Sequence, residues 1–585
     1  MVAAVPRSGT PETSPTAPPS PASAPAPSAA SAGQPSLRRR VLVSALVLLA
    51  VAALFVAYLH VSRTYPENSD ESNDLLMGWD LLHGNLLLHG WYLSDVSFIT
   101  TELPQYALLV GLLGLHTDTA HVAAAMTYTL VVIVAVLLAR GSAARVPRGQ
   151  AWPRMLLMAG LLFAPQLGVG VFILVLSLGH IGTSVPLMLI WLVLDRAERF
   201  RPRWLVPIVV GLLMTWVLVA DPLVLIAGIV PLVAVCAVRV IREVAAAGRP
   251  AGRPRGWLGS SLQQQWYEVT LAVAAILAEG LASLVNWLIK AGGGFLLHPV
   301  GYQLAPAHTW PKHAYVTGKG LLALFGALPQ GIGVPTPAPA AAIAFAVVHL
   351  AGVALVAWAM LRVARHFLSW PDMISQILLV AIVVNVVLYV PSTLADATDL
   401  NAREFAIVLP FGAVLAGRTL AGGLRGRAID ATVVHDGWGW ARWQKGLAAA
   451  LLAAYAASLG YAAAQPSVPA ANTQLAAFLA AHHLTRGIGG YWESSVVTVT
   501  SGGAVVIRAV GPDLLEPDMW ESKFAWYDPA TQRATFLVTD SASGFFNHWE
   551  PRASALASLG RPVRTYHVGT YTIYVWDKNL LADLP

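Results

Sequence analysis

An acidic segment follows the first apolar run of the chain and holds the side chains best suited to proton transfer. Residues 65–91 read YPENSDESNDLLMGWDLLHGNLLLHGW, and their carboxylates and histidines are Glu67, Asp70, Glu71, Asp74, Asp80, His83 and His89. A carboxylate can take a proton from a hydroxyl group within hydrogen-bond reach. His83 and His89 could join Asp80 at a metal, but their spacing of six does not place them on one helix face. We therefore read both histidines as polar-face side chains.

Two short turns between apolar runs carry further ionisable side chains. His180 lies in 178-LGHIGT-183, and Asp221 lies in the triplet Ala220-Asp221-Pro222. Ionisable groups near the ends of membrane helices are functional candidates by default. For Asp221 the alternative is an N-cap for the helix that Pro222 begins. For His180 a structural and a functional role remain equally open.

Two later segments could contact phosphate and sugar. The basic and aromatic side chains of the segment 290–319 are Lys290, His298, Tyr302, His308, Trp310, Lys312, His313 and Lys319. This segment could equally be a mobile lid without chemistry. The segment 392–404 clusters Asp396, Asp399, Arg403 and Glu404. Arg403 could pair with a phosphate, or it could pair with Asp399 in a purely structural bridge.

Composition places all these segments in a polytopic α-helical membrane protein. Of the 585 residues 56% are hydrophobic and 12% charged, against about 25% charged in soluble domains. Several apolar runs reach the roughly 20 residues that cross a bilayer. We predict about eleven transmembrane helices, at 41–59, 119–139, 155–176, 181–195, 204–220, 222–239, 267–289, 340–362, 373–391, 404–418 and 445–463.

The distribution of Lys and Arg predicts the orientation. Basic residues gather in the predicted inner loops, beginning with Arg38, Arg39 and Arg40 ahead of the first span. The predicted outer loops before residue 464 hold only Arg63, Lys290, Lys312, Lys319 and Arg403. By the positive-inside rule the N-terminus is cytoplasmic and the C-terminal domain lies outside the plasma membrane. The net charge of +6 then reflects the topology. We predict anionic membrane lipids as partners of the basic inner loops, and we predict no nucleic-acid partner.

The chain divides into three predicted parts. Residues 1–36 are rich in Pro, Ala and Ser and predict a disordered cytoplasmic tail. Residues 37–463 form the transmembrane domain. Its first outer loop, 60–118, carries two interfacial helices, at 74–87, where Leu75, Trp79, Leu82 and Leu86 recur at helical spacing, and at 103–115. Residues 464–585 predict an extracytoplasmic α/β domain with a helix at 472–484 and strands at 496–500, 504–510, 535–539 and 571–576; Ser501-Gly502-Gly503 indicates a hairpin.

The order of these features resembles a known superfamily. Asp70-Glu71 is followed by Gly84, by 102-ELPQY-106, by a short apolar helix and by a return span that ends in Leu138-Ala139-Arg140. This layout is similar to the N-terminal half of GT-C glycosyltransferases, such as protein O-mannosyltransferases and lipid A aminoarabinose transferases. The segment 399-DLNAREFAIVLPFGAVLAGR-418 also resembles their late span. Here Glu404 separates Arg403 from the aromatic Phe405, which departs from the usual basic-aromatic pair.

The resemblance implies the chemistry and the site. GT-C enzymes take a sugar from a polyprenyl-phosphate carrier at the outer membrane face, and a carboxylate of the first outer loop acts as general base. Asp70 is the first choice for that base and Glu71 the second, while Asp74 and Asp80 are read as solvated polar-face residues. The predicted substrate-binding residues are Glu102 (or a helix cap), His180, Asp221, His298, Lys312, His313, Asp399 and Arg403. The cofactor is unknown; some members use a divalent cation such as Mg or Mn, and we predict no metal ligand.

The sequence therefore predicts an inverting membrane glycosyltransferase. It would move a hexose or pentose to an envelope glycan, lipid or protein acceptor, with the C-terminal domain binding that acceptor or serving assembly. We expect Asp70, His180, Asp221 and Arg403 to converge on one outward cavity. The alternatives are a transporter or lipid flippase, which would need polar residues in mid-span, and a non-enzymatic scaffold, which would not need Asp70. High Ala, Arg, Pro and Gly usage is typical of a GC-rich bacterial source such as an actinobacterium.

Overall fold

The computed structural model describes most of the chain. The described residues are 37–141, 148–163, 167, 169–176, 179–197, 202–246, 265–299, 303–328, 340–395, 399–420, 442–542 and 548–585. The predicted tail 1–36 lies outside them. Contacts divide the chain into two units, Met1–Ala50 and Val51–Pro585. In the first unit, residues 37–50 are helical and exposed, as the beginning of α1 (Leu37–Ser62).

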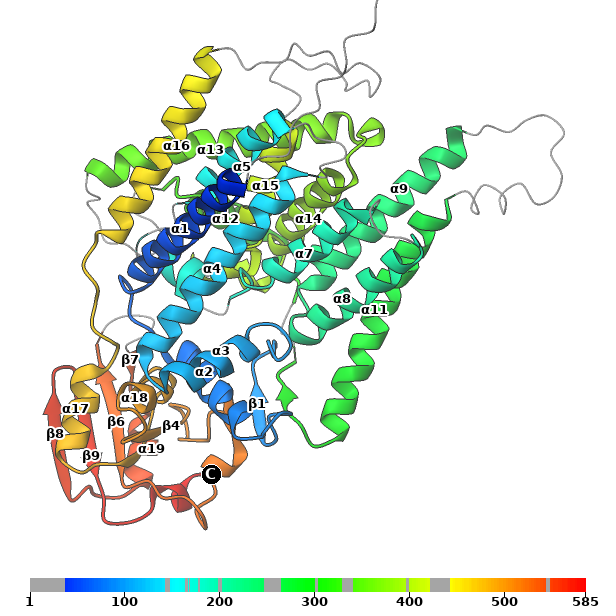
Figure 1. The fold of residues 1–585 in the computed structure, drawn as a ribbon. Coiled ribbons are helices and arrows are strands. Elements are labelled where there is room, and N and C mark those ends of the chain that lie inside the picture. Colours follow the sequence, from blue (N-terminus) through cyan, green and yellow to red (C-terminus); the bar gives the residue numbers. More distant parts are fainter. Residues whose placement is uncertain are drawn as a thin grey trace, which may run out of the picture. The chain divides into compact units, whose positions relative to one another are not determined.

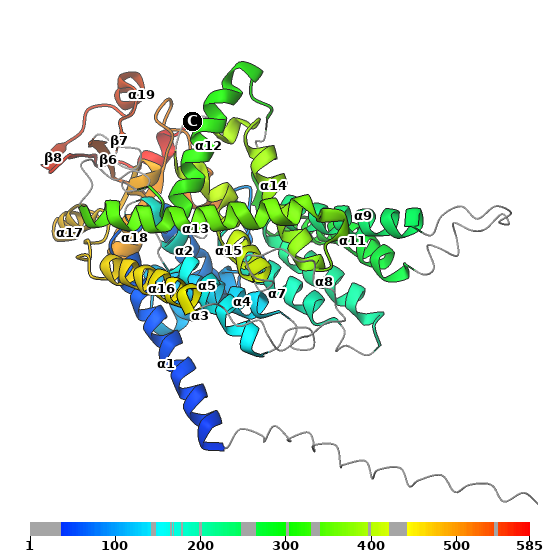
Figure 2. The ribbon, with the colours of Figure 1, turned by 90° about the horizontal axis from the view of Figure 1, so that it is seen from above.

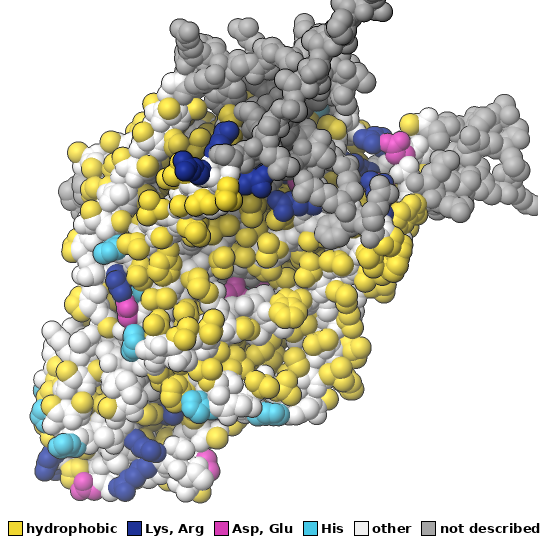
Figure 3. All heavy atoms as spheres, in the orientation of Figure 1, with side chains coloured by type: hydrophobic (Ala, Val, Ile, Leu, Met, Phe, Trp, Pro, Cys, Tyr) yellow, Lys and Arg dark blue, Asp and Glu magenta, His cyan; other side chains and the backbone are white. Residues whose placement is uncertain are grey.

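Most predicted spans are helices in the structure (Figure 1). By length and composition, six helices of the described residues could cross a membrane: α1, α4 (Thr117–Arg140), the joined η3 (Leu225–Ile229) and α9 (Val230–Ala246), α11 (Trp266–Ala291), α13 (Ala340–Arg365) and α16 (Arg442–Ala463). The other predicted spans contain shorter apolar helices: α5 (Arg148–Leu162), α7 (Ser184–Asp195), α8 (Leu205–Ala220), α14 (Met373–Tyr389) and α15 (Val408–Thr419). These are the features of a multi-pass membrane protein. On the face seen in Figure 3, hydrophobic side chains cover most of the helical region.

Helix α15 lies at the centre of the helical bundle. It packs against α4, α5, α13 and α14 (Figure 2), and each of its side chains is buried. A twelve-residue helix can be apolar all round only because neighbours enclose it. Its two ends carry the arginines that the sequence places there, with Arg403 in the preceding 3-10 helix η7 (Asp399–Phe405) and Arg418 in the last turn.

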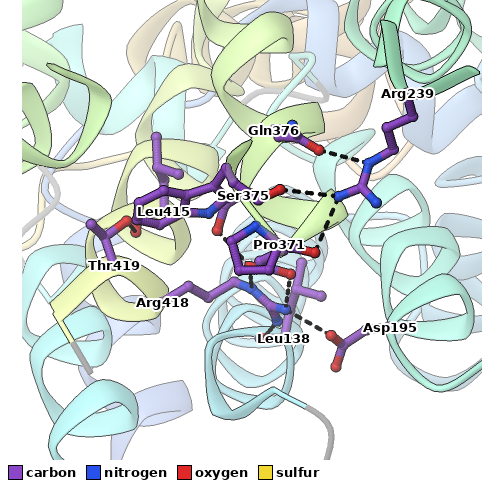
Figure 4. Close-up of polar contacts among 11 residues, drawn as sticks. Leu138, Asp195, Arg239, Pro371, Ser375, Gln376, Leu415, Arg418 and Thr419 are labelled. Atoms are coloured by element: carbon purple, nitrogen blue, oxygen red, sulfur yellow. Dashed lines mark hydrogen bonds and ion pairs between the residues drawn. The ribbon is translucent and has the colours of Figure 1, made fainter. Parts of the chain in front are cut away.

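Arg418 ties several helix ends together at one end of the bundle (Figure 4). Its guanidinium donates to Asp195 Oδ1 at 2.7 Å, to Asp372 Oδ2 at 2.8 Å and to the Leu138 carbonyl at 2.6 Å. These partners come from the ends of α7, α14 and α4. The predicted order of membrane crossings places all these ends on the same side of the bundle as Arg418, and the contacts agree with that prediction.

Replacing Arg418 by Met is expected to lower the free energy of unfolding by about 3–5 kcal/mol, because it leaves the buried Asp195 and the partly buried Asp372 without their cation. Unfolding in detergent measures the change. Arg242→Met is the matched control, since the Arg242–Glu243 pair is about one-third exposed and such pairs contribute about 0–1 kcal/mol. Equal losses in the two variants would contradict the assignment.

The first outer loop folds differently from the prediction in one respect. Helix α2 spans Ser69–Leu82 rather than 74–87, and α3 spans Leu103–Leu113. Leu75, predicted to face lipid, is fully buried, because α2 packs so closely on α3 that a Cβ at Gly78 would lie 3.0 Å from the Ala107 backbone nitrogen. The outer face of the pair still exposes apolar side chains: Trp79, Leu82, Leu86, Leu108 and Leu112.

A small three-stranded sheet joins three distant segments. β1 (Trp91–Leu93) pairs in parallel with β2 (Leu296–Leu297) and antiparallel with β5 (Ser522–Lys523). The first loop, the 290–319 segment and the C-terminal region therefore lie on one side of the bundle, as the topology predicts. The second half of 290–319 is not a loop but the helix α12 (Trp310–Leu324). A proline lies in the first turn of this helix, a position that proline favours.

The C-terminal region contains a mixed sheet. Its strands run in the order β4 (Val506–Ala509), β3 (Arg486–Gly489), β6 (Phe536–Ser541), β9 (Tyr571–Val575) and β8 (Arg564–Val568), and β7 (His548–Trp549) also pairs with β6. β4, β3 and β6 are parallel neighbours, while β9 and β8 are antiparallel. The predicted helix at 472–484 is confirmed as α17 (Thr473–Ala481), and three of the four predicted strands are confirmed as β4, β6 and β9.

The predicted strand 496–500 is wrong, and with it the hairpin. These residues form the helix α18 (Ser495–Thr500), followed by a turn with positive φ at Gly502 and Gly503. Val496 and Val497 pack into the core of the sheet, whereas Val499 packs into the core of the first loop. Burial on two sides outweighs the β preference of valine, so α18 links the sheet to α2.

Candidate functional site

Asp70 lies in the first turn of α2, and its neighbour Glu71 closes the helix cap. The Asn68 side chain accepts from the Asp70 amide at 2.9 Å, and Glu71 Oε2 accepts from the Asn68 amide at 2.8 Å. This capping box holds Glu71 fully buried, while the Asp70 side chain is 20% exposed. Burial, and then the charge of Asp70, raise the pKa of Glu71 well above its usual value. Of the predicted pair, only Asp70 is partly exposed.

Two donors from distant parts of the chain flank Asp70. The Tyr491 hydroxyl donates to Asp70 Oδ1 at 2.8 Å, and Arg403 Nη1 lies 3.7 Å from Asp70 Oδ2. Tyr491 belongs to the 3-10 helix η9 (Tyr491–Glu493) that directly follows β3. Burial raises the pKa of Asp70, although Arg403 and Tyr491 act in the opposite direction. A base with a raised pKa holds a proton more strongly once it has taken it.

A chain of ionic contacts runs from Arg403 to the two predicted turns. Arg403 Nε lies 3.5 Å from Glu404 Oε1, and Glu404 Oε2 lies 3.1 Å from His180 Nε2. His180 Nδ1 lies 2.7 Å from Asp221 Oδ2. The four residues expected to converge are therefore connected through Glu404. A cavity of about 630 Å³ lies elsewhere, lined by Arg242 and residues 364–369. None of the four residues lines it.

Asp221 is the C-cap of α8, and the helix that follows has Val224 as its N-cap, so the N-cap interpretation of Asp221 is wrong. Its Oδ1 accepts from the Leu223 amide in the intervening turn at 2.8 Å, while its Oδ2 faces His180 and accepts from Thr183 Oγ1 at 2.5 Å. Its role in substrate binding stays a prediction. Burial lowers the pKa of His180, but Asp221 and Glu404 outweigh burial and raise it well above 6.5. His180 is thus a cation held between two carboxylates at neutral pH.

Replacing His180 by Gln is expected to lower the free energy of unfolding by about 3–5 kcal/mol at neutral pH, because Asp221 and Glu404 lose their shared cation. A raised folded-state pKa stabilises the fold fully below about pH 6.5, and this contribution is lost as pH rises through the raised value. The difference between wild type and variant should therefore shrink in alkaline solution. A pH series of unfolding measurements tests this, and a difference that grows with pH would contradict it.

Glu102 borders the same cluster from α3. Its side chain is 4% exposed and makes no cap hydrogen bond, so the capping interpretation is wrong. A Cβ at Gly182 would lie 2.1 Å from Glu102 Oε1, which puts the carboxyl against the turn that carries His180. Burial raises the pKa of Glu102 to about 8, so it is largely neutral at pH 7. Its two oxygens have no hydrogen-bond partner within the described part of the chain.

The other predicted binding residues occupy different places. His298 follows β2 and stacks between Tyr92, at a centroid distance of 4.1 Å, and Trp520, at 5.1 Å. Lys312 is exposed on α12, whereas His313 is buried there and contacts the Val390 carbonyl at 3.0 Å through Nδ1. The side chain of Asp399 lies outside the described residues, so its proposed bridge to Arg403 stays a prediction.

The neighbouring acids differ from their prediction. Asp74 is buried rather than solvated, and burial, followed by the charge of Glu521, raises its pKa well above the usual value. Asp80 is half-buried and binds Lys523 and the Trp91 indole nitrogen, so it holds β5 against the first loop. His83 contacts its own helix and His89 the Gly293 carbonyl. The polar-face interpretation therefore fails for both acids, because the C-terminal region covers that face.

Sequence reasoning missed three polar residues of this centre. They are Tyr491, Glu521 and Asp95, which belong to none of the motifs described above. Burial, and then Glu404, raise the pKa of Asp95. No periodic signal marks such residues, because Tyr491 and Glu521 each have a partner in the first loop that lies hundreds of positions away in the sequence.

The residues around Asp70 do not fit a divalent cation. Among the described residues, no group of three or more His, Cys, Asp or Glu side chains could hold a metal ion. The guanidinium of Arg403 lies 3.7 Å from Asp70 Oδ2, and Tyr491 donates to Oδ1. Mg and Mn require several oxygen ligands free to accept the metal, and both oxygens of Asp70 already face donors.

Comparisons with known proteins found similarity only among solved structures. No family model and no curated protein matches the chain. The Archaeoglobus fulgidus oligosaccharyltransferase, solved with Zn and sulfate, is 12% identical; the alignment covers 91% of this chain and 73% of that one, with a TM-score of 0.43. ArnT from Cupriavidus metallidurans, bound to undecaprenyl phosphate, is 13% identical over 91% and 98%, with a TM-score of 0.26. Neither likeness is close enough to establish a shared fold or activity, so the function is argued from the site itself.

Proposed function

We propose that this protein is a membrane glycosyltransferase of GT-C type that moves a sugar from a polyprenyl-phosphate-linked donor to an acceptor outside the plasma membrane. One observation carries the proposal. A partly exposed carboxylate, Asp70, lies 3.7 Å from a partly exposed guanidinium, Arg403, at the end of an apolar helix bundle. The carboxylate can take the proton of the attacking hydroxyl, and the guanidinium can stabilise the negative charge that develops on the leaving phosphate.

The reaction assigns one task to each group. Asp70 takes the proton of the acceptor hydroxyl as the oxygen attacks the anomeric carbon. The bond from that carbon to the phosphate oxygen breaks on the opposite face, so the configuration inverts. The lipid phosphate leaves with the bonding electron pair, and Arg403 stabilises its negative charge. The proton on Asp70 then passes to solvent, which restores the base.

The surroundings support these two tasks. Glu404 contacts Arg403 Nε and is itself held by His180, which pairs with Asp221, so the positions that the guanidinium can take are limited. The helix α2, which carries Asp70 in its first turn, exposes apolar side chains near its other end, and α3 exposes more. The polyprenyl chain of the donor would lie along this apolar face.

A transfer assay with purified wild-type protein in lipid vesicles tests the proposal. Polyprenyl-phosphate hexoses and pentoses are supplied with glycan, lipid or peptide acceptors, and both the glycosylated acceptor and the released polyprenyl phosphate are measured. A glycosyltransferase releases the two in equal amounts. A flippase would move the intact donor between leaflets without cleaving it, and a scaffold would leave the donor unchanged; either result contradicts the proposal.

A further inference from the structure

Three oxygens form a short row between the first loop and the C-terminal region. The Tyr491 hydroxyl lies 2.8 Å from Asp70 Oδ1 and 3.0 Å from Glu521 Oε2. Asn73 donates to the same hydroxyl at 3.1 Å and to Glu521 Oε2 at 3.3 Å. One phenol therefore contacts two carboxyl groups and one amide.

Counting hydrogens shows that this row needs one more proton than three ordinary side chains supply. A phenolic hydroxyl has a single hydrogen to donate. If Asp70 and Glu521 were both ionised, one of the two short oxygen contacts would lack a hydrogen and would bring lone pairs together. The contact is satisfied only if one of the carboxyl groups carries a proton and donates it to the Tyr491 oxygen.

The charges nearby decide which carboxyl group holds that proton. Arg403 lies within 3.7 Å of Asp70 and favours the ionised form there. Glu521 has no cation within ion-pair distance among the described residues, and burial, then the charge of Asp70, raise its pKa to about 8. The other charged or titratable groups that face it are Asp74 on α2, Tyr491 on η9 and Arg403 on η7.

We infer that Glu521 is a positioning residue of the reaction: its protonated carboxyl donates to the Tyr491 hydroxyl, which in turn donates to the ionised Asp70. This inference rests on the proposed function and adds the C-terminal region to the catalytic centre. The backbone of Glu521 supports a dedicated placement, since its φ of 49° is a left-handed conformation that costs energy for a residue with a Cβ. The pairing of β5 with β1 and the Lys523–Asp80 ion pair hold this segment in place.

A set of four variants tests the inference through the dependence of transfer rate on pH. Tyr491→Phe removes the hydrogen bond to the charged base and should lower kcat about tenfold or more. Glu521→Ala removes only the donor that orients the Tyr491 hydroxyl, so it should lower kcat in the same direction by less. Glu521→Gln can still donate through its amide, so it should recover most of the rate that Glu521→Ala loses. Glu516→Gln, exposed in the same region, is the control and should behave as wild type.

The direction in which the transfer rate changes with pH follows from the proton on Glu521. Wild-type activity should fall as pH rises through about 8, where Glu521 ionises and no longer donates. Glu521→Gln cannot ionise, so its rate should not fall in that range. A Gln variant as impaired as the Ala variant, or one that keeps the alkaline fall, would overturn the inference, because Glu521 would then act as an anion.

An infrared titration separates this inference from the proposed function. Protonated carboxyl groups give an infrared carbonyl band, and wild type should lose more of this band near pH 8 than Glu521→Gln does, because Glu102, with its pKa of about 8, contributes equally to both proteins. If wild type transfers no sugar but shows this extra loss, the proposed function fails and the proton placement stands. If transfer occurs and the Gln variant loses as much of the band as wild type, the proton placement fails and the function stands.

Discussion

Replacing Asp70 by Asn is expected to lower kcat for sugar transfer by about 100- to 10,000-fold, the contribution of a positioned general base. Asn is close in size to Asp and can still accept from the Tyr491 hydroxyl, so the fold should survive while proton removal is lost. The initial rate of polyprenyl phosphate release in vesicles measures the effect. The KM for the donor should change less than kcat, because the base acts on the acceptor hydroxyl.

Glu71→Gln is the matched control for Asp70→Asn. Glu71 accepts from the Asn68 amide inside the capping box and is fully buried. Glutamine can accept the same bond, since a capping box takes Glu or Gln at this position, so Glu71→Gln should keep the helix cap and leave transfer close to the wild-type rate. Transfer unaffected by either substitution would remove the catalytic assignment of this acidic pair. Loss only in Glu71→Gln would reverse the order of the two residues.

Replacing Arg403 by Gln is expected to lower kcat by about 100- to 1,000-fold, the effect of removing one group that stabilises a developing charge. Arg403 is the cation nearest to Asp70, and its side chain is 36% exposed and so open to a phosphate. Arg403→Lys keeps the charge but not the planar fork and should recover only part of the loss. Rates with donors whose phosphate leaving groups differ in pKa measure this directly.

Arg63→Gln is the control for Arg403→Gln. Arg63 lies on the same side of the bundle and pairs with Asp118, but both side chains are at least one-third exposed. Exposed pairs of this kind contribute about 0–1 kcal/mol, so transfer should stay close to the wild-type rate. If Arg403→Gln changed the rate no more than Arg63→Gln, the leaving phosphate would need another partner.

Several elements could be predicted because their signals are local. Apolar runs of sufficient length appear as helices, and the alternation of Lys and Arg between loops places 60–118 and 464–585 on the same side, which the pairing of β1 and β5 supports. The helix at 472–484 and the strands β6 and β9 were visible as local periodicity. Each of these signals depends on whether neighbouring residues face water, lipid or core.

Other features failed for one common reason. The segment 496–500 alternates as a strand does, yet it is a helix, because Val497 and Val499 are buried in different cores. Asp74 and Asp80 were predicted to face solvent, but in the structure the C-terminal region covers them. Burial by a partner that lies hundreds of residues away leaves no periodic mark, so local reasoning assigns such residues to solvent.

The sequence by itself determined the membrane class, grouped the loops that lie on the same side of the bundle and limited the acids and bases that could do the chemistry to a small set. Only the tertiary structure distinguishes the surroundings of Asp70 from those of Glu71, since the capping box buries one carboxylate and leaves the other beside Arg403. It also added Tyr491 and Glu521, which no motif marks. The physical reason is that residue type sets which chemistry is available, whereas proton sharing and ion pairing depend on distances of about 3–4 Å that packing alone creates.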